Sequence, residues 1–228
     1  NIRYYGELHG MGGADLTLPA GFRANTTAAM PLASSLHSVE IGTTRSRYDA
    51  GLSFNTGPNW THSLTLRRDV RDGTQRMGGS FFATSAQLVA PVDQVTNQLQ
   101  VSTHYTRARM QASLGYQVSL FTNGNAGLVW SNPFTEGGAG TSRGQLALAP
   151  DNQFHQLLGS GSYEVLSWVR ASGDVAIGRM TQDAAFLPAT LNPTLAMALP
   201  AVPDSSLHGK VDTFNGNGRL AFRLSDRL

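Results

Sequence analysis

The sequence contains no cysteine among its 228 residues. A disulfide framework and a thiolate metal site are therefore excluded. Covalent attachment of a c-type haem is excluded as well, because that attachment requires a Cys-x-x-Cys-His motif. These absences remove several function classes before any pattern is considered.

Long apolar runs are also missing. No stretch approaches the roughly 20 consecutive apolar residues that a transmembrane helix requires. This absence excludes a helical membrane protein. It leaves a membrane β-barrel open, because a barrel strand needs only about ten residues of alternating character.

Charge is scarce. Charged residues make up 14% of the chain, with 17 basic and 15 acidic side chains, whereas an ordinary soluble domain carries about a quarter. No long basic run is present, so nucleic-acid binding is not expected. The abundant glycine and uncharged polar residues favour strands with one apolar and one hydrated face, and argue against disorder or a helix bundle.

Strict alternation of apolar and polar residues is the strongest pattern. It predicts strands over 46–55, 60–70, 98–106 and 109–121. The last run is longer than the usual five or six residues of a globular strand and matches a tilted membrane strand. Further strands are predicted at 80–90, 126–130, 152–165, 168–181 and 207–224, with weaker candidates at 2–8 and 36–43.

These strands predict an all-β fold. We expect an antiparallel up-and-down transmembrane β-barrel with roughly ten strands in this chain. Residues 1–228 are expected to form one barrel segment, with long loops near 132–150 and 183–206 and with 1–45 poorly assigned. Aromatic residues near the strand ends are typical of a membrane-interface girdle: Tyr48, Trp60, Tyr105, Phe121, Trp130, Tyr163 and Trp168.

The polarity of each face predicts its surroundings, because lipid tolerates a charged side chain poorly at the bilayer midplane. The residues expected to face lipid are Tyr48, Leu52, Phe54, Leu64, Leu66, Met110, Leu114, Tyr116, Val118 and Leu120. The residues expected to face the lumen are Arg47, Asp49, Ser53, Asn55, Arg67, Asp69, Gln111, Ser113, Gln117, Arg170 and Asp174.

No catalytic constellation is apparent. The six histidines are scattered, and no two stand at metal-ligand spacing. The glycine-rich strings 159–162 and 215–218 do not continue into the Gly-Lys-Ser/Thr of a phosphate loop. We therefore predict no enzyme, and no catalytic, cofactor-binding or metal-binding residue. A soluble β-sandwich remains an alternative, although its strands would be shorter.

Several strings carry a more specific likeness. They are 130–134 (WSNPF), 147–155 (ALAPDNQFH), 159–163 (GSGSY), 178–183 (GRMTQD) and 209–213 (GKVDT). Together, in this order, they resemble the MtrB/PioB family of decahaem-associated outer-membrane proteins. The matches run from about residue 47 to residue 228.

The resemblance implies the porin of a porin–cytochrome electron conduit in the bacterial outer membrane. Such a barrel sheaths a periplasmic multihaem c-type cytochrome and docks an extracellular one. The haems would belong to the partner, and this chain would bind no cofactor itself. The family's barrel is much longer than this chain, and about eight strands enclose little more than their own side chains. We therefore expect an internal segment of a larger barrel.

A general solute-diffusion porin with a polar lumen is the main alternative, because it shares every compositional feature. If a cytochrome fills the lumen, the lumen-facing polar residues would contact it. Four glycines would then let it approach the wall closely: Gly51, Gly115, Gly159 and Gly161.

Overall fold

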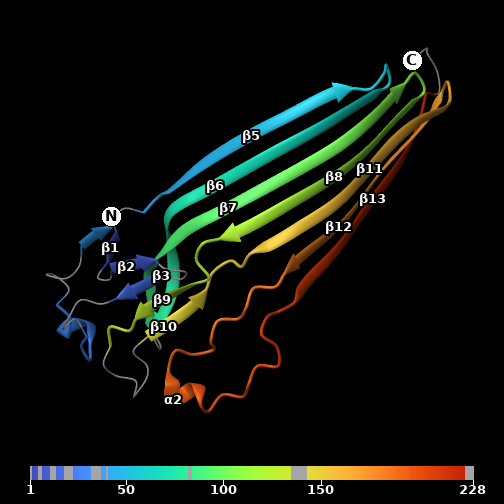
Figure 1. Ribbon diagram of the computed structural model, residues 1–228. Coiled ribbons are helices and arrows are strands. Elements are labelled where there is room, and N and C mark those ends of the chain that lie inside the picture. The colour runs from blue at the N-terminus through green and yellow to red at the C-terminus, as the bar shows by residue number, and fades with distance from the viewer. Residues whose placement is uncertain are drawn as a thin grey trace.

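One antiparallel sheet of seven long strands dominates the protein (Figure 1). The computed structural model describes residues 2–4, 7–10, 14–17, 23–31, 37–39, 41–81, 84–134 and 143–223. The strands of this sheet are β5 (Thr43–Asn55), β6 (Trp60–Phe81), β7 (Thr84–Arg107), β8 (Met110–Asn123), β11 (Asn152–Leu166), β12 (Val169–Gln182) and β13 (Gly209–Phe222). They lie in chain order from β5 to β13, and these two form its edges.

The connections at the two ends of the sheet differ in length. Short turns join β5 to β6, β7 to β8 and β11 to β12, at the end of the sheet near the chain terminus marked C in Figure 1. Gly57 takes a left-handed φ of 76° in the first of these turns, a conformation that favours glycine. The longer connections, from β8 to β11 and from β12 to β13, lie at the opposite end.

A smaller, four-stranded sheet stands at the end with the long connections (Figure 1). Its strands are β2 (Glu7–Gly10), β3 (Ala14–Thr17), β9 (Gly127–Ser131) and β10 (Arg143–Ala147). β3 and β9 pair in parallel. Strands β1 (Ile2–Tyr4) and β4 (His37–Val39) form a separate pair, and the short helical segments are η1 (Thr27–Ala29) and α2 (Pro193–Ala196).

Helix contributes little to this fold. Asn192 caps α2, where its side chain accepts a hydrogen bond from the backbone N–H of Thr194. Within the described ranges, no helix has the length and apolar composition needed to cross a membrane.

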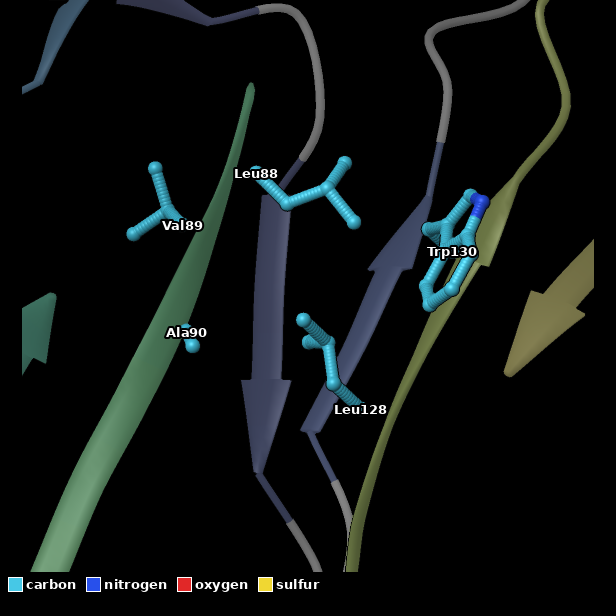
Figure 2. Close-up of a cluster of buried hydrophobic side chains, with 5 residues drawn as sticks. All are labelled: Leu88, Val89, Ala90, Leu128 and Trp130. Carbon is cyan, nitrogen blue, oxygen red and sulfur yellow. The ribbon is translucent and has the colours of Figure 1, made fainter. Parts of the chain in front are cut away.

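Strands β6 and β7 extend beyond their neighbours as a two-stranded arm. β5 begins opposite Gly73 and β8 ends opposite Gln94, yet β6 and β7 remain paired as far as Phe81 and Thr84. The arm packs against β9, as Figure 2 shows. The buried cluster contains Leu88, Val89, Ala90, Leu128 and Trp130.

Trp130 is the largest side chain of this buried cluster. Its ring lies against Gly144 of β10, where an added Cβ atom would stand 2.4 Å from Cε2 of the indole. A Cβ at Gly79 of β6 would come 2.5 Å from Leu88 Cδ1 and 3.5 Å from the indole. These two glycines therefore leave the space that Trp130 and Leu88 fill.

The base of the β12–β13 loop is closed by three polar side chains. The Ser206 hydroxyl donates to Asp183 Oδ1, and His208 Nδ1 lies 2.7 Å from the same oxygen. His208 adopts a left-handed φ of 46°, which is uncommon for a residue with a side chain. The hydrogen bond from Ser206, with a smaller contribution from His208, holds the pKa of Asp183 below its usual range.

This contact predicts a loop that loosens in acid. Because the folded-state pKa of Asp183 is lowered, the contact stabilises the loop above the unfolded pKa of about 4. It loses that contribution as the pH falls through the lowered value. The protection factor of the His208 amide, which donates to Ser206 Oγ, should therefore fall as the pH is lowered from about 5 to about 2. Asp183→Asn should remove this pH dependence, whereas Asp204→Asn should keep it.

Most of the predicted strands are present, with several differences. The predicted strand 80–90 begins in β6, which continues past residue 70 to Phe81, and runs on in β7, which also contains the predicted strand 98–106. Strands β3 and β10 were not predicted, and β10 lies within the stretch 132–150 that was expected to be a long loop. The alternation fails in the arm because both faces are buried, as Leu88, Val89 and Ala90 show. The described ranges contain thirteen strands, compared with the predicted ten or so.

Candidate lumen surface

The pairing register divides the large sheet into two faces. Directly opposed residues of an antiparallel pair point to the same side. One register row runs Asp49, Arg67, Gln98, Ser119, Phe154, Met180 and Val211. The row in register with Leu52 contains Leu64, Val101, Tyr116, Leu157, Ile177 and Phe214.

The two predicted groups of residues fall on opposite faces. All eleven residues predicted for the lumen share the face of Arg67, which we call the polar face. All ten predicted for lipid share the opposite face of Leu64, which we call the apolar face. What each face contacts in the membrane remains a prediction.

The apolar face leaves large hydrophobic side chains uncovered. Leu52, Leu114 and Ile177 are 60%, 53% and 53% exposed. Such an extended apolar surface is unusual for a protein in water. Aromatic rings gather at its short-turn end, where Trp60 and Tyr105 lie 4.9 Å apart between ring centroids, and this arrangement is typical of an interface girdle.

Two of the predicted girdle residues lie elsewhere. Phe121 is on the polar face, because it pairs with Thr96 and Asn152. Trp130 is in the buried cluster of the arm. Both residues stand at the end of an alternating run in the sequence, as the other predicted girdle residues do. Their position in the sequence therefore did not distinguish them.

The apolar band crosses the strands diagonally. Phe54 is in register with Gly216 through the intervening strands, while the last outward apolar residue of β13 is Phe222, six residues further on. A shift of one residue per strand, at about 3.3 Å per residue and 4.8 Å per strand, corresponds to a tilt of about 35°. Barrel strands in membranes are tilted by about 35–45°.

A charged cluster occupies the polar face at the long-connection end. Arg45 Nη2 lies 2.6 Å from Asp69 Oδ2, and Arg67 Nε lies 2.6 Å from Asp49 Oδ1. Arg47 Nε stands between the two carboxylates, at 3.7 Å from Asp49 and 4.0 Å from Asp69. The sequence prediction had placed four of these side chains on one face, and the structure brings them into one network.

Small hydroxyl side chains line the polar face at the short-turn end. Ser63 and Ser102 are joined by a 2.6 Å hydrogen bond, and Ser113 and Ser160 by one of 2.7 Å. Ser113 and Ser160 border a hollow of about 540 Å³, which we call the serine hollow. Further residues that line it are His104, Gln111, Ser162, Ser172, Asp174 and Arg219.

The polar face also carries apolar residues that the alternation had not revealed. Phe154, Met180 and Val211 are consecutive members of one register row, and Leu158 lies on the same face. Met180 and Val211 are 41% and 55% exposed. We call Phe154, Leu158, Met180 and Val211 the inner apolar patch. Alternation does not mark them, because apolar residues stand on both faces of this part of the sheet: Leu157 and Ile177 pair on one face, and Phe154 and Met180 on the other.

Comparison with known proteins identifies the family of this chain. The family model for putative outer membrane beta-barrel porins of the MtrB/PioB type matches residues 2–228. The chain belongs to this family. It is also 28% identical over 221 residues to outer membrane protein MtrB of Shewanella baltica. That match covers 96% of this chain and 31% of the relative, so the chain spans about a third of the relative's length.

Membership of the MtrB/PioB family confirms three predictions. The protein is an outer-membrane protein, its fold is that of an all-β antiparallel barrel, and the resemblance in the sequence strings was correct. The family is described as a porin and not as a class of enzyme. Within the described part of the chain, no group of three or more His, Cys, Asp or Glu residues is placed to hold a metal ion.

The glycines of this MtrB/PioB chain divide between the two faces, and this corrects one prediction. Gly51 and Gly115 lie on the polar face, as expected. Gly159 and Gly161 lie on the apolar face, because they pair with Leu114 and Ala112. The prediction was wrong because glycine has no side chain polarity, so the alternation around residues 159–162 did not fix their face.

Proposed function

We propose that the longer barrel sheaths a periplasmic multihaem c-type cytochrome and docks an extracellular one, so that electrons cross the outer membrane through the partner's haems. This chain supplies part of the barrel wall. Its polar face lines the lumen, and its apolar face contacts lipid. In this proposal the haems belong to the partner, and this chain, which has no cysteine, attaches none of them covalently.

The inner apolar patch is the observation that carries the proposal. A water-filled pore has a polar interior, and exposed side chains such as Met180 and Val211 on that side would contact water unfavourably. Another protein inside the barrel would cover them. The mixture of arginines and apolar residues on this face is also the composition that protein interfaces favour.

The expected width of the barrel supports the same proposal. Seven strands of the large sheet fall within a chain that matches 31% of the relative. If strands are evenly spaced along such a protein, the whole barrel contains about 22 strands, a size at which known barrels hold a folded plug in the lumen.

Purification of the full-length barrel from detergent-solubilised outer membranes tests the proposal. We expect a c-type haem spectrum to co-elute with the barrel at a fixed stoichiometry, and a haem-stained gel to show a multihaem subunit. A barrel that elutes without haem, from cells that make the cytochromes, would contradict the proposal.

A solute-diffusion porin is the second candidate. The arginines at the long-connection end of the polar face favour this porin, because rings of basic side chains select anions in pores. Purified barrels in planar bilayers distinguish the two candidates. An open porin conducts ions without any partner, whereas a sheath filled by a cytochrome conducts few ions until that partner is removed.

A further inference from the structure

The charged cluster on β5 and β6 contains more guanidinium groups than carboxylates. Asp69 is held by Arg45 and Asp49 by Arg67, each at 2.6 Å. Arg47 reaches the same carboxylates only at 3.7 and 4.0 Å. With Arg71, which lies on the same face opposite Gln94, the cluster has four arginines and two aspartates. The excess is two positive charges.

Arg71 has no carboxylate within ion-pair distance among the described residues. A guanidinium has five N–H donors in a planar fork that matches a carboxylate. Arg71 can therefore donate all of its guanidinium N–H groups to a ligand. Arg47 can donate the N–H groups that do not point to Asp49 or Asp69. The two aspartates hold the other arginines in place and do not neutralise the cluster.

These arginines surround a hollow of about 330 Å³, which we call the arginine hollow. The neutral side chains that complete it come from β7 and β8, and they include Gln94, Thr96, Gln98 and Phe121. The amide and hydroxyl groups add hydrogen-bond donors, and Phe121 adds an aromatic surface. Arginine and aromatic residues, phenylalanine among them, are both enriched at protein interfaces.

The arginine hollow lies at the long-connection end of the polar face, on β5 to β8. On the opposite side of the same strands, Arg68 interrupts the apolar run after Leu66 and donates to the Asn97 side chain at 3.0 Å. Val70 and Val95 follow it, so the outer face is mixed at the level of the hollow.

We propose that the arginine hollow binds carboxylate groups presented by an acidic surface of the protein inside the barrel, and so fixes the depth at which that protein is held. This proposal rests on the proposed function. An ion-pair network that only strengthened the wall would need no surplus arginine. A surplus next to an aromatic ring suits a partner that brings its own carboxylates.

Charge reversal at Arg71 tests the proposal without breaking the existing ion pairs. The experiment uses the full-length barrel with its cytochrome, washed on a column through increasing NaCl, with retained haem per barrel as the readout. We expect Arg71→Glu to weaken retention by about tenfold or more, because a like charge then faces the partner's carboxylates. Arg71→Lys should keep most of the retention. Arg219→Glu, on the same face in the serine hollow, should leave it unchanged.

Three outcomes would contradict the proposal or call for a second variant. If Arg71→Glu retains haem like the wild type, or if Arg219→Glu loses as much, the arginine hollow is not the binding site although the sheath function stands. If the wild-type barrel carries no haem, the proposed function fails and this inference with it. If Arg71→Glu does not assemble, Arg47→Gln provides the same test, with a smaller loss expected.

Discussion

Replacing Leu114 by arginine should destabilise the barrel by about 2–4 kcal/mol, the cost of a basic side chain at the bilayer midplane. Leu114 is central on the apolar run of β8 and 53% exposed. Its partner on β11 is Gly159, which has no side chain, and its partner on β7 is Thr103, so a single hydroxyl is the only side-chain acceptor on the two directly opposed residues. The free energy of folding of the full barrel into lipid vesicles, measured by urea titration, gives the value directly.

Gln117→Arg is the matched control on the same strand. Gln117 pairs with Gln100 and Gln156 and points to the polar face. An arginine there remains hydrated in the lumen, so its effect should stay within about 0.5 kcal/mol, as at an ordinary surface position. Equal losses for the two variants would show that the faces are assigned incorrectly. A larger loss for Gln117→Arg would reverse the assignment.

Replacing Trp130 by alanine should cost about 3–5 kcal/mol in the buried cluster, as for other large aromatic side chains in cores. Trp130 is 6% exposed and packs beside Leu88 and Leu128, which are almost completely buried. The loss should appear locally, because the cluster joins the arm to β9, beyond the ends of β5 and β8 in the large sheet. Limited proteolysis should therefore cut within 127–147 while the membrane strands stay protected.

Two further variants test whether the packing of the Trp130 indole is the cause of this local cleavage. Gly144→Ala should produce the same local cleavage, because the new methyl group would stand 2.4 Å from the indole and displace it. Trp168→Ala should not, since Trp168 is 48% exposed at the short-turn end. Cleavage of the membrane strands in Trp130→Ala would mean that the arm and the sheet unfold as one unit.

The membrane strands could be predicted from the sequence because each has one apolar and one polar face. In β8 every second residue from Met110 to Leu120 is apolar or small, and the structure keeps these residues on one face. A period of two is a direct consequence of the pleat. The alternation can therefore be recognised in one strand without knowledge of the strands beside it.

The arm and the arginine hollow could not be predicted in the same way. Val89 is as buried as its neighbours Leu88 and Ala90, so the arm shows no alternation. Arg71 lies beyond the predicted end of its strand, and its surplus charge becomes visible only when the register brings β5 beside β6. Both features depend on contacts between segments that are distant in the sequence.

The parallel pairing of β3 with β9 has a consequence for the order of folding. Ala14 pairs with Leu128, and the hairpins of β5 to β8 lie between these two residues in the chain. Closing so long a loop costs entropy that the local hairpins do not incur. The small sheet should therefore assemble last, and its completion can serve as a kinetic marker that the preceding strands have found their register.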